Sequence, residues 1–151
     1  MQVLWRPMRV LLGLLLRRPL VGACIIPILP NGQVVLIRRR DTGLWALPGG
    51  LVDWGEDIAT AAQRELAEET GLRVTQVGRL VGVYSQPGRD PRFHSVCVLI
   101  ELCVAGQPTI HDLAEVMEIQ AFPLAEAIQL PLDHDHICHI KDYLADRTVL
   151  A

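Results

Sequence analysis

The stretch RELAEETG, from Arg64 to Gly71, places three glutamates in two turns of a predicted helix that the glycine ends. Asp57 is a suitable N-cap residue for the start of that helix. The last turn of a helix carries the negative end of the helix dipole, so Glu68 and Glu69 occupy an unfavourable position for carboxylates. A chain that folds with this helix therefore needs a nearby source of positive charge.

A helical wheel shows which way these glutamates point. At about 100° per residue, Ile58, Ala62 and Leu66 define an apolar face. Glu65 and Glu69 fall within about 20° of Ile58, so both point toward the protein interior. Burying unpaired carboxylates costs several kcal/mol each. These two glutamates are therefore not part of a solvated helix face.

The counter-charge can come from an arginine or from a metal ion. Arg64 reaches Glu68 most easily, at the i+4 position, and offsets only part of the charge. A divalent cation is the simpler solution, and all-oxygen ligands select Mg²⁺ or Mn²⁺ over zinc. Mg²⁺ held by few carboxylates is typical of sites that act on phosphates. A structural cluster bridged by arginine is the alternative.

The loop before the helix suits a ligand site. Gly49 and Gly50 allow the backbone to approach a ligand closely. Glu56 precedes the helix, where the dipole favours a carboxylate. It could reach back to hold the loop, or it could join the metal ligands.

Composition narrows the function further. The chain has 151 residues, is 50% hydrophobic and carries a net charge of −3. These values predict one globular domain and argue against a nucleic-acid surface held by basic residues. The four cysteines form no C-x-x-C pair, and no convincing secretory signal is present. We therefore expect reduced thiols and a cytoplasmic protein.

Residues 1–18 form an apolar extension before the domain at 19–151. The apolar run Val10–Leu16 is far too short to span a membrane. We expect a short helix packed on the domain or on a second subunit. Membrane-surface contact is the alternative, because arginines flank the run on both sides.

The remaining chain predicts a mixed α/β fold. Hydrophobic patterns and turn signals predict a sheet with helices on both faces. We expect strands over 20–29, 33–39, 74–85, 94–105 and 116–122, a short strand near 46–47, and helices over 58–70, 123–128 and 135–147.

Residues Gly50 to Leu72, GLVDWGEDIATAAQRELAEETGL, resemble the Nudix signature G-x5-E-x7-R-E-U-x-E-E-x-G-U at every fixed position, where U is aliphatic. The resemblance implies an α/β/α sandwich with a mixed sheet. It also implies Mg²⁺-dependent attack of water on a nucleoside diphosphate linked to another group.

The same resemblance assigns roles to residues. It implies that Glu65, Glu68 and Glu69 ligate Mg²⁺, often with the carbonyl of Gly49, while Arg64 and Glu56 orient the loop and helix. We expect Glu68 or Glu65 to be the general base and count Arg64 with the catalytic group. Later acidic candidates for the base are Asp112, Glu115 and Glu118.

The substrate class must be sought outside this motif. The stretch YSQPGRDPRFHS resembles the ADP-ribose pyrophosphatase branch, and Pro87 lies 15 residues past Leu72, as a proline often does there. This implies cleavage of ADP-ribose or an ADP-sugar to AMP and a sugar phosphate, and a homodimer. Arg89 and Arg92 are candidate contacts for phosphate or the terminal ribose. Candidate adenine-stacking residues are Trp45, Trp54, Tyr84 and Phe93.

Three other interpretations stay open. The chain could instead hydrolyse nucleoside triphosphates such as oxidised dGTP, or it could bind a nucleotide as a sensor without turnover. A zinc site could involve His134, His136, His139 and Cys138, but on a helix His136 and Cys138 point apart.

Overall fold

The computed structural model describes residues 18–151, so the apolar run at 10–16 lies outside the described residues. The elements in chain order are β1 (Leu20–Ile28), β2 (Val34–Arg39), β3 (Trp45–Ala46), β4 (Gly49–Leu51), α2 (Ile58–Thr70), β5 (Arg73–Tyr84), β6 (Ser95–Ala105), β7 (Val116–Phe122), α3 (Leu124–Ala127), α4 (His136–Leu144) and β8 (Val149–Leu150). No helix within residues 18–151 is long and apolar enough to cross a membrane.

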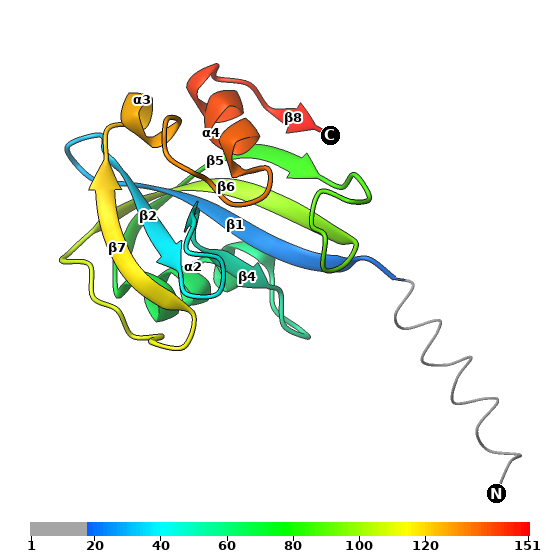
Figure 1. The fold of residues 1–151 in the computed structure, drawn as a ribbon, viewed down its shortest axis with the longest axis horizontal. Helices are drawn as coiled ribbons and strands as arrows, with labels where there is room; N and C mark the ends of the chain where they lie inside the picture. Colours follow the sequence, from blue (N-terminus) through cyan, green and yellow to red (C-terminus); the bar gives the residue numbers. More distant parts are fainter. Residues whose placement is uncertain (1–17) are drawn as a thin grey trace, which may run out of the picture.

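The strands form one mixed sheet in the order β3-β2-β1-β6-β5-β8. β1 and β6 are parallel over their whole shared length, from Leu20 opposite Ser95 to Ile28 opposite Cys103. β4 pairs with the first half of β1, and β7 pairs with β2, both antiparallel. Figure 1 shows α2 on one side of this sheet and α3 and α4 on the other, which confirms the predicted sandwich.

The middle of strand β1, residues 23–27, is apolar and buried on both faces of the sheet. Ala23 and Ile25 pack in the core that α2 covers, together with Leu66. Cys24 and Ile26 alternate with them and belong to the core beneath the C-terminal helices. The sheet therefore holds α2 on one side and α4 on the other at fixed positions relative to β1.

Helix α2 has the ends that the sequence predicts. The Asp57 side chain accepts a hydrogen bond from the Thr60 backbone N–H at 2.8 Å. Gly71 adopts a left-handed conformation with φ of 67°, and its N–H donates to the Ala67 carbonyl at 3.0 Å. These caps fix the turn on which the three glutamates lie.

The short strands were harder to predict. One was expected near 46–47, whereas the structure has β3 on the edge of β2 and β4 on the edge of β1. Two- and three-residue strands are too short to carry a hydrophobic period, and only their pairing defines them. β4 matters for the site because it fixes Gly49 and Gly50 beside α2.

We expect Leu66→Ala to lower the free energy of unfolding by about 2–5 kcal/mol, because Leu66 is fully buried between α2 and the sheet. Urea unfolding followed by circular dichroism measures this loss. Gln63→Ala, on the exposed face of the same helix, is the control and should change it by less than about 0.5 kcal/mol. Equal losses in both variants would contradict the packing described.

Candidate functional site

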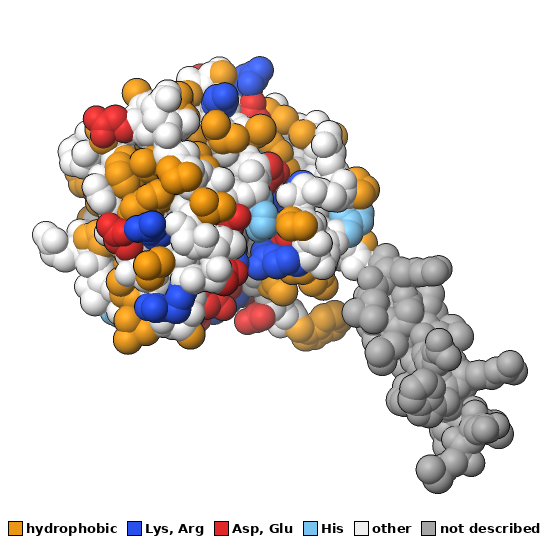
Figure 2. Space-filling view, viewed as in Figure 1, with side chains coloured by type: hydrophobic (Ala, Val, Ile, Leu, Met, Phe, Trp, Pro, Cys, Tyr) orange, Lys and Arg blue, Asp and Glu red, His pale blue; other side chains and the backbone are white. Residues whose placement is uncertain are grey.

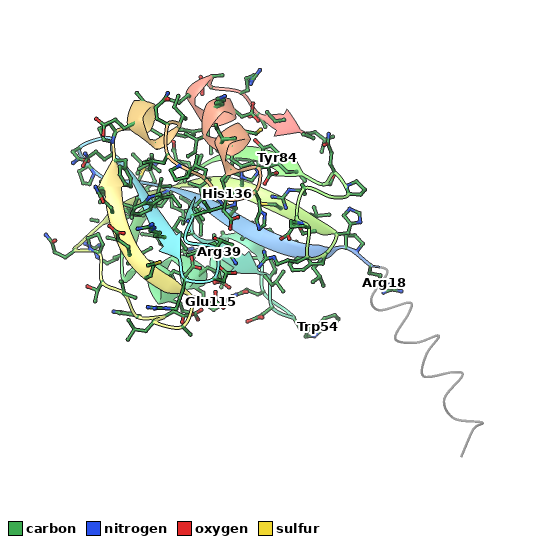
Figure 3. The ribbon with its side chains drawn as sticks, viewed as in Figure 1. Arg18, Arg39, Trp54, Tyr84, Glu115 and His136 are labelled. Atoms are coloured by element: carbon green, nitrogen blue, oxygen red, sulfur yellow. The ribbon has the colours of Figure 1, made fainter. Side chains whose placement is uncertain are left out.

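A cavity of about 630 Å³ lies between α2, the sheet and the loops that precede β7 and α4. Acidic side chains gather where α2 meets it, and arginines, histidines and thiols line the rest. Figure 3 shows Arg39 between Glu115 and His136, and Figure 2 shows charged and histidine side chains around the hollow on this face. Its ionisable lining residues are Glu65, Glu68, Glu69, Asp112, Glu115, Arg39, Asp41, Arg89, Asp90, Arg92, His134, His136, Cys24 and Cys97.

Arg64 joins the loop before α2 to the helix. Its Nε and Nη2 donate to both oxygens of Glu56, at 2.9 and 3.0 Å, and Nη1 donates to Glu65 at 2.7 Å. Nη2 also donates to the Leu51 carbonyl at 3.0 Å. The contact with Glu68, which the sequence favoured, is longer at 3.4 Å. Hydrogen bonds from Arg64 lower the pKa of Glu56, which lies outside the cavity lining, so its geometry supports the loop-holding role.

Glu69 is the carboxylate without a cationic partner. Its side chain is 5% exposed, and its Oε2 accepts the Gly49 backbone N–H at 2.9 Å. Within residues 18–151, no lysine or arginine forms an ion pair with it. Burial, together with the nearby charge of Glu65 and against the hydrogen bond from Gly49, raises the pKa of Glu69 to about 8. A cation bound beside Glu69 would therefore stabilise its charged form more than it would stabilise that of Glu65 or Glu68.

Glu65 and Glu68 complete the acidic group. Burial raises the pKa of Glu65 above its usual range, although the bond from Arg64 opposes this. A Cβ on Gly50 would overlap the Glu65 carboxylate, so any other residue there would displace that carboxylate from its present position. Glu68 is exposed and lines the cavity. Three carboxylates from one helix, one of them buried and unpaired, fit a hard divalent cation.

Three charged residues from other segments, Asp112, Glu115 and Arg39, line the same cavity as the α2 glutamates. Asp112 and Glu115, two of the later acids considered from the sequence, line the cavity. Glu118 does not, because it faces Arg38 at 3.4 Å. Sequence reasoning missed Arg39, which ends β2 and contacts Asp41 at 2.6 Å. A charged residue at the end of an apolar strand, beside a glycine-rich loop, was the signal for it.

Arg89 lines the cavity but is largely committed to the protein. Its Nε and Nη2 donate to Asp135 at 2.8 and 2.9 Å, and Nη1 donates to Ser95 Oγ at 2.7 Å. The hydrogen bonds from Arg89 and His139 overcome burial and lower the pKa of Asp135. Arg89 therefore clamps the β5–β6 loop to α4, and substrate contact is a secondary role for it.

The Arg92 side chain is more accessible to a ligand than that of Arg89. It is half exposed, pairs with Asp90 at 2.8 Å, and lies 5.2 Å from the centre of the Phe93 ring. Both Arg92 and Phe93 line the cavity. Their roles as a phosphate contact and an aromatic stacking residue stay predictions.

Other predicted substrate contacts lie elsewhere. The structure contradicts the expectation for Trp45, which is 8% exposed and packs edge-on against Phe122 in the core. Tyr84 is also buried, with its hydroxyl donating to Asp142. Pro87 and Trp54 are exposed and lie outside the cavity lining, whereas Gly50 lines it. Aromatic identity alone could not separate core from cavity.

The histidines form a cluster different from the one considered from the sequence. Cys24, His136 and His139 bring one potential ligand atom each within 4.8 Å of one another, while Cys138 is exposed. The Leu47 backbone N–H donates to His136 Nδ1 at 2.9 Å. A metal at Nδ1 would therefore compete for an occupied lone pair, and Nε2 carries the proton. This chemistry does not fit a metal ligand.

Residues 18–143 match the NUDIX domain, so the chain belongs to the Nudix family and is a Nudix hydrolase. It is 40% identical over 118 residues to the ADP-ribose pyrophosphatase of Methanocaldococcus jannaschii, covering 76% of this chain and 67% of that protein. It is also 44% identical over 66 residues to a putative 8-oxo-dGTP diphosphatase of Bacillus subtilis, covering 44% of each.

Among solved structures, the NUDIX domain of Shewanella oneidensis NrtR complexed with ADP ribose is similar, with a TM-score of 0.77 and 26% identity. The match covers 86% of this chain and 89% of that one. Nudix proteins generally use a divalent metal, which agrees with the donor set on α2.

In the metal-free protein, we expect the free energy of unfolding to fall as the pH rises from about 4.5 toward 8. The folded state retains a proton on Glu69, whose pKa is about 8, while the unfolded chain releases it at the ordinary value of 4.5. The slope contributed is at most about 1.4 kcal/mol per pH unit.

Urea unfolding in chelator at several pH values measures this slope. Glu69→Gln should flatten it, while Glu126→Gln, on exposed α3, should not. A slope unchanged by Glu69→Gln would show that the carboxylate is not protonated in the folded protein.

Proposed function

We propose that this protein hydrolyses the pyrophosphate bond of ADP-ribose or a related ADP-sugar, with Mg²⁺ or Mn²⁺, to give AMP and a sugar phosphate. The observation that carries this proposal is the buried Glu69 beside Glu65 and Glu68, at the end of a cavity whose other residues include arginines. The acids would hold the cation, and the arginines would face the anionic substrate.

The reaction adds water across one P–O–P linkage. The oxygen of water bonds to one phosphorus, and the bridging oxygen leaves with the other phosphate. A bound cation supplies neutralisation of the phosphate oxygens and a lower pKa for the attacking water. Glu68 is exposed and lines the cavity, and in this proposal it would accept the proton from the attacking water. Arg64 keeps Glu65 and the loop in position through its ion pairs.

Cavity size and similarity support the choice of substrate. A volume of about 630 Å³ lies within the range of small-molecule sites. The relative with 40% identity is an ADP-ribose pyrophosphatase, and a similar domain with 26% identity was solved with ADP ribose. Arg39 and Arg92 also line the cavity, each in an ion pair with a neighbouring aspartate through Nε and Nη2, and the Nη1 group of each could donate to a phosphate.

A substrate panel tests the proposal. We expect ADP-ribose with Mg²⁺ to yield AMP and ribose 5-phosphate in equal amounts, measured by chromatography and mass spectrometry, and no product in chelator. Pyrophosphate release from 8-oxo-dGTP, without AMP from ADP-ribose, would support the nucleoside-triphosphate alternative instead. Binding of ADP-ribose without turnover of any panel member would support the sensor alternative.

We expect Glu68→Gln to lower kcat for the best panel substrate by about 10²-fold or more, because it removes both a cation ligand and the proposed base. Melting temperature and circular dichroism should stay near those of the wild type, since Glu68 is exposed. Glu126→Gln, on α3, is the matched control and should keep normal turnover. Near-normal kcat in Glu68→Gln would remove this residue from the proposed mechanism.

A further inference from the structure

Three large apolar side chains lie exposed around the point where the chain enters the domain. Leu20 begins β1 and is 41% exposed, and Leu51 ends β4 and is 44% exposed. Trp54, in the turn after β4, is fully exposed. We call these three residues the entry patch. Tryptophan is highly buried on average, so a fully exposed one near other exposed apolar side chains indicates an interaction surface.

Strand pairing brings the entry patch together. Gly22 pairs with Leu51, and because side chains alternate along a strand, Leu20 lies on the same face of the sheet as Leu51. Beyond this pair, the Val52 N–H donates to the Val21 carbonyl at 2.9 Å, and the turn that carries Trp54 follows. Figure 3 shows Trp54 at the end of the molecule where Arg18 lies. The patch is therefore one local feature at the start of β1.

Acidic side chains border the entry patch. Asp53 precedes Trp54, and its side chain is 74% exposed. Asp57 is exposed three residues after Trp54. Asp53 lies 3.7 Å from Arg64, and an exposed pair at that distance leaves much of its charge to solvent. We call Asp53 and Asp57 the acidic rim. A segment that suits this surface is apolar and carries basic residues beside its apolar part.

The sequence contains one such segment next to the patch. Residues 10–16, VLLGLLL, are apolar, and arginines stand on both sides of them at Arg6, Arg9, Arg17 and Arg18. The apolar run suits the entry patch, and the arginines suit the acidic rim. An anionic membrane surface, the other occupant considered for this run, would repel the carboxylates of the rim.

The chain connection also favours this segment. Leu16 is four residues from Leu20, which is at most about 14 Å of extended chain. The run therefore ends close to the patch, and so short a tether gives it an effective concentration in the millimolar range. The same segment of a second copy has no such advantage at ordinary protein concentrations.

We propose that residues 10–16 dock on the entry patch of their own chain, with the flanking arginines attracted to the acidic rim. Docking would cover Leu20, Leu51 and Trp54. The Leu51 carbonyl accepts a hydrogen bond from Arg64, and Leu51 lines the cavity. The docked segment would therefore hold the turn between β4 and α2 beside the acidic group. The proposal does not depend on which substrate the cavity takes.

Acrylamide quenching of tryptophan fluorescence in the full chain tests this contact. The parent protein carries Trp5→Phe, which removes the one tryptophan outside residues 18–151. Trp45 is 8% exposed, so the quenchable emission reports on Trp54. The polar variant adds Leu12→Ser and Leu15→Ser within the run. Circular dichroism verifies that each protein is folded.

We expect the polar variant to be quenched about 5- to 10-fold more than the parent, because the undocked state then rises from about 10% or less to most of the population. Its emission maximum should move to longer wavelength. Leu113→Ser, at an exposed leucine outside the patch, is the control and should match the parent. Asp53→Asn should raise quenching by about 2-fold, the range for one exposed ion pair. High salt should raise it less in Asp53→Asn than in the parent.

Equal quenching in the parent and the polar variant would overturn the proposal. Protection of Trp54 that increases with protein concentration, together with self-association in sedimentation velocity, would overturn it in favour of a second copy. Protection that arises only with vesicles of phosphatidylglycerol would overturn it in favour of a membrane surface. Protection in the monomer without vesicles, lost in the polar variant, is the result that supports docking within one chain.

Discussion

The hydrogen bond from the Gly49 N–H to the buried carboxylate of Glu69 is the contact on which the site depends. It joins β4, which pairs with β1, to the last turn of α2. The same turn is closed by Gly71, whose N–H donates to the Ala67 carbonyl. The fold holds an acid where burial away from water and the helix dipole both disfavour its charged form. A cation bound at this point would offset the free-energy cost of the buried Glu69 charge. In the metal-free protein, Glu69 avoids that cost by keeping its proton.

Around that contact, Arg64 separates two kinds of glutamate. It binds Glu56 on the loop and Glu65 on the helix, which fixes the loop against α2 from the side away from the cavity. Among residues 18–151, no arginine or lysine forms an ion pair with Glu69. Arg64 therefore positions the acidic side chains but balances only part of their negative charge. The remaining negative charge is available to a metal ion.

The C-terminal helix supplies the other half of the cavity. The Arg89–Asp135 pair ties the β5–β6 loop to α4, and the Leu47 N–H orients the His136 imidazole at the start of that helix. One side of the cavity thus carries Glu69, whose carboxylate has no cationic partner within residues 18–151, whereas on the other side the charges of Arg89 and Asp135 are paired with each other.

The sequence by itself determined the unit from Gly49 to Gly71, because its caps, its helical period and its carboxylate spacing are all local. The wheel placed Glu65 and Glu69 toward the interior, and the structure has Glu69 buried and Glu65 partly buried. It could not place Trp45 in the core, Arg39 in the cavity or Glu118 outside it, since each depends on strand pairing across the chain. Likewise only tertiary structure decided the tautomer of His136, because its partner Leu47 is 89 residues away in sequence. Local periodicity fixes which face a side chain takes on its own element, while long-range packing decides what that face meets.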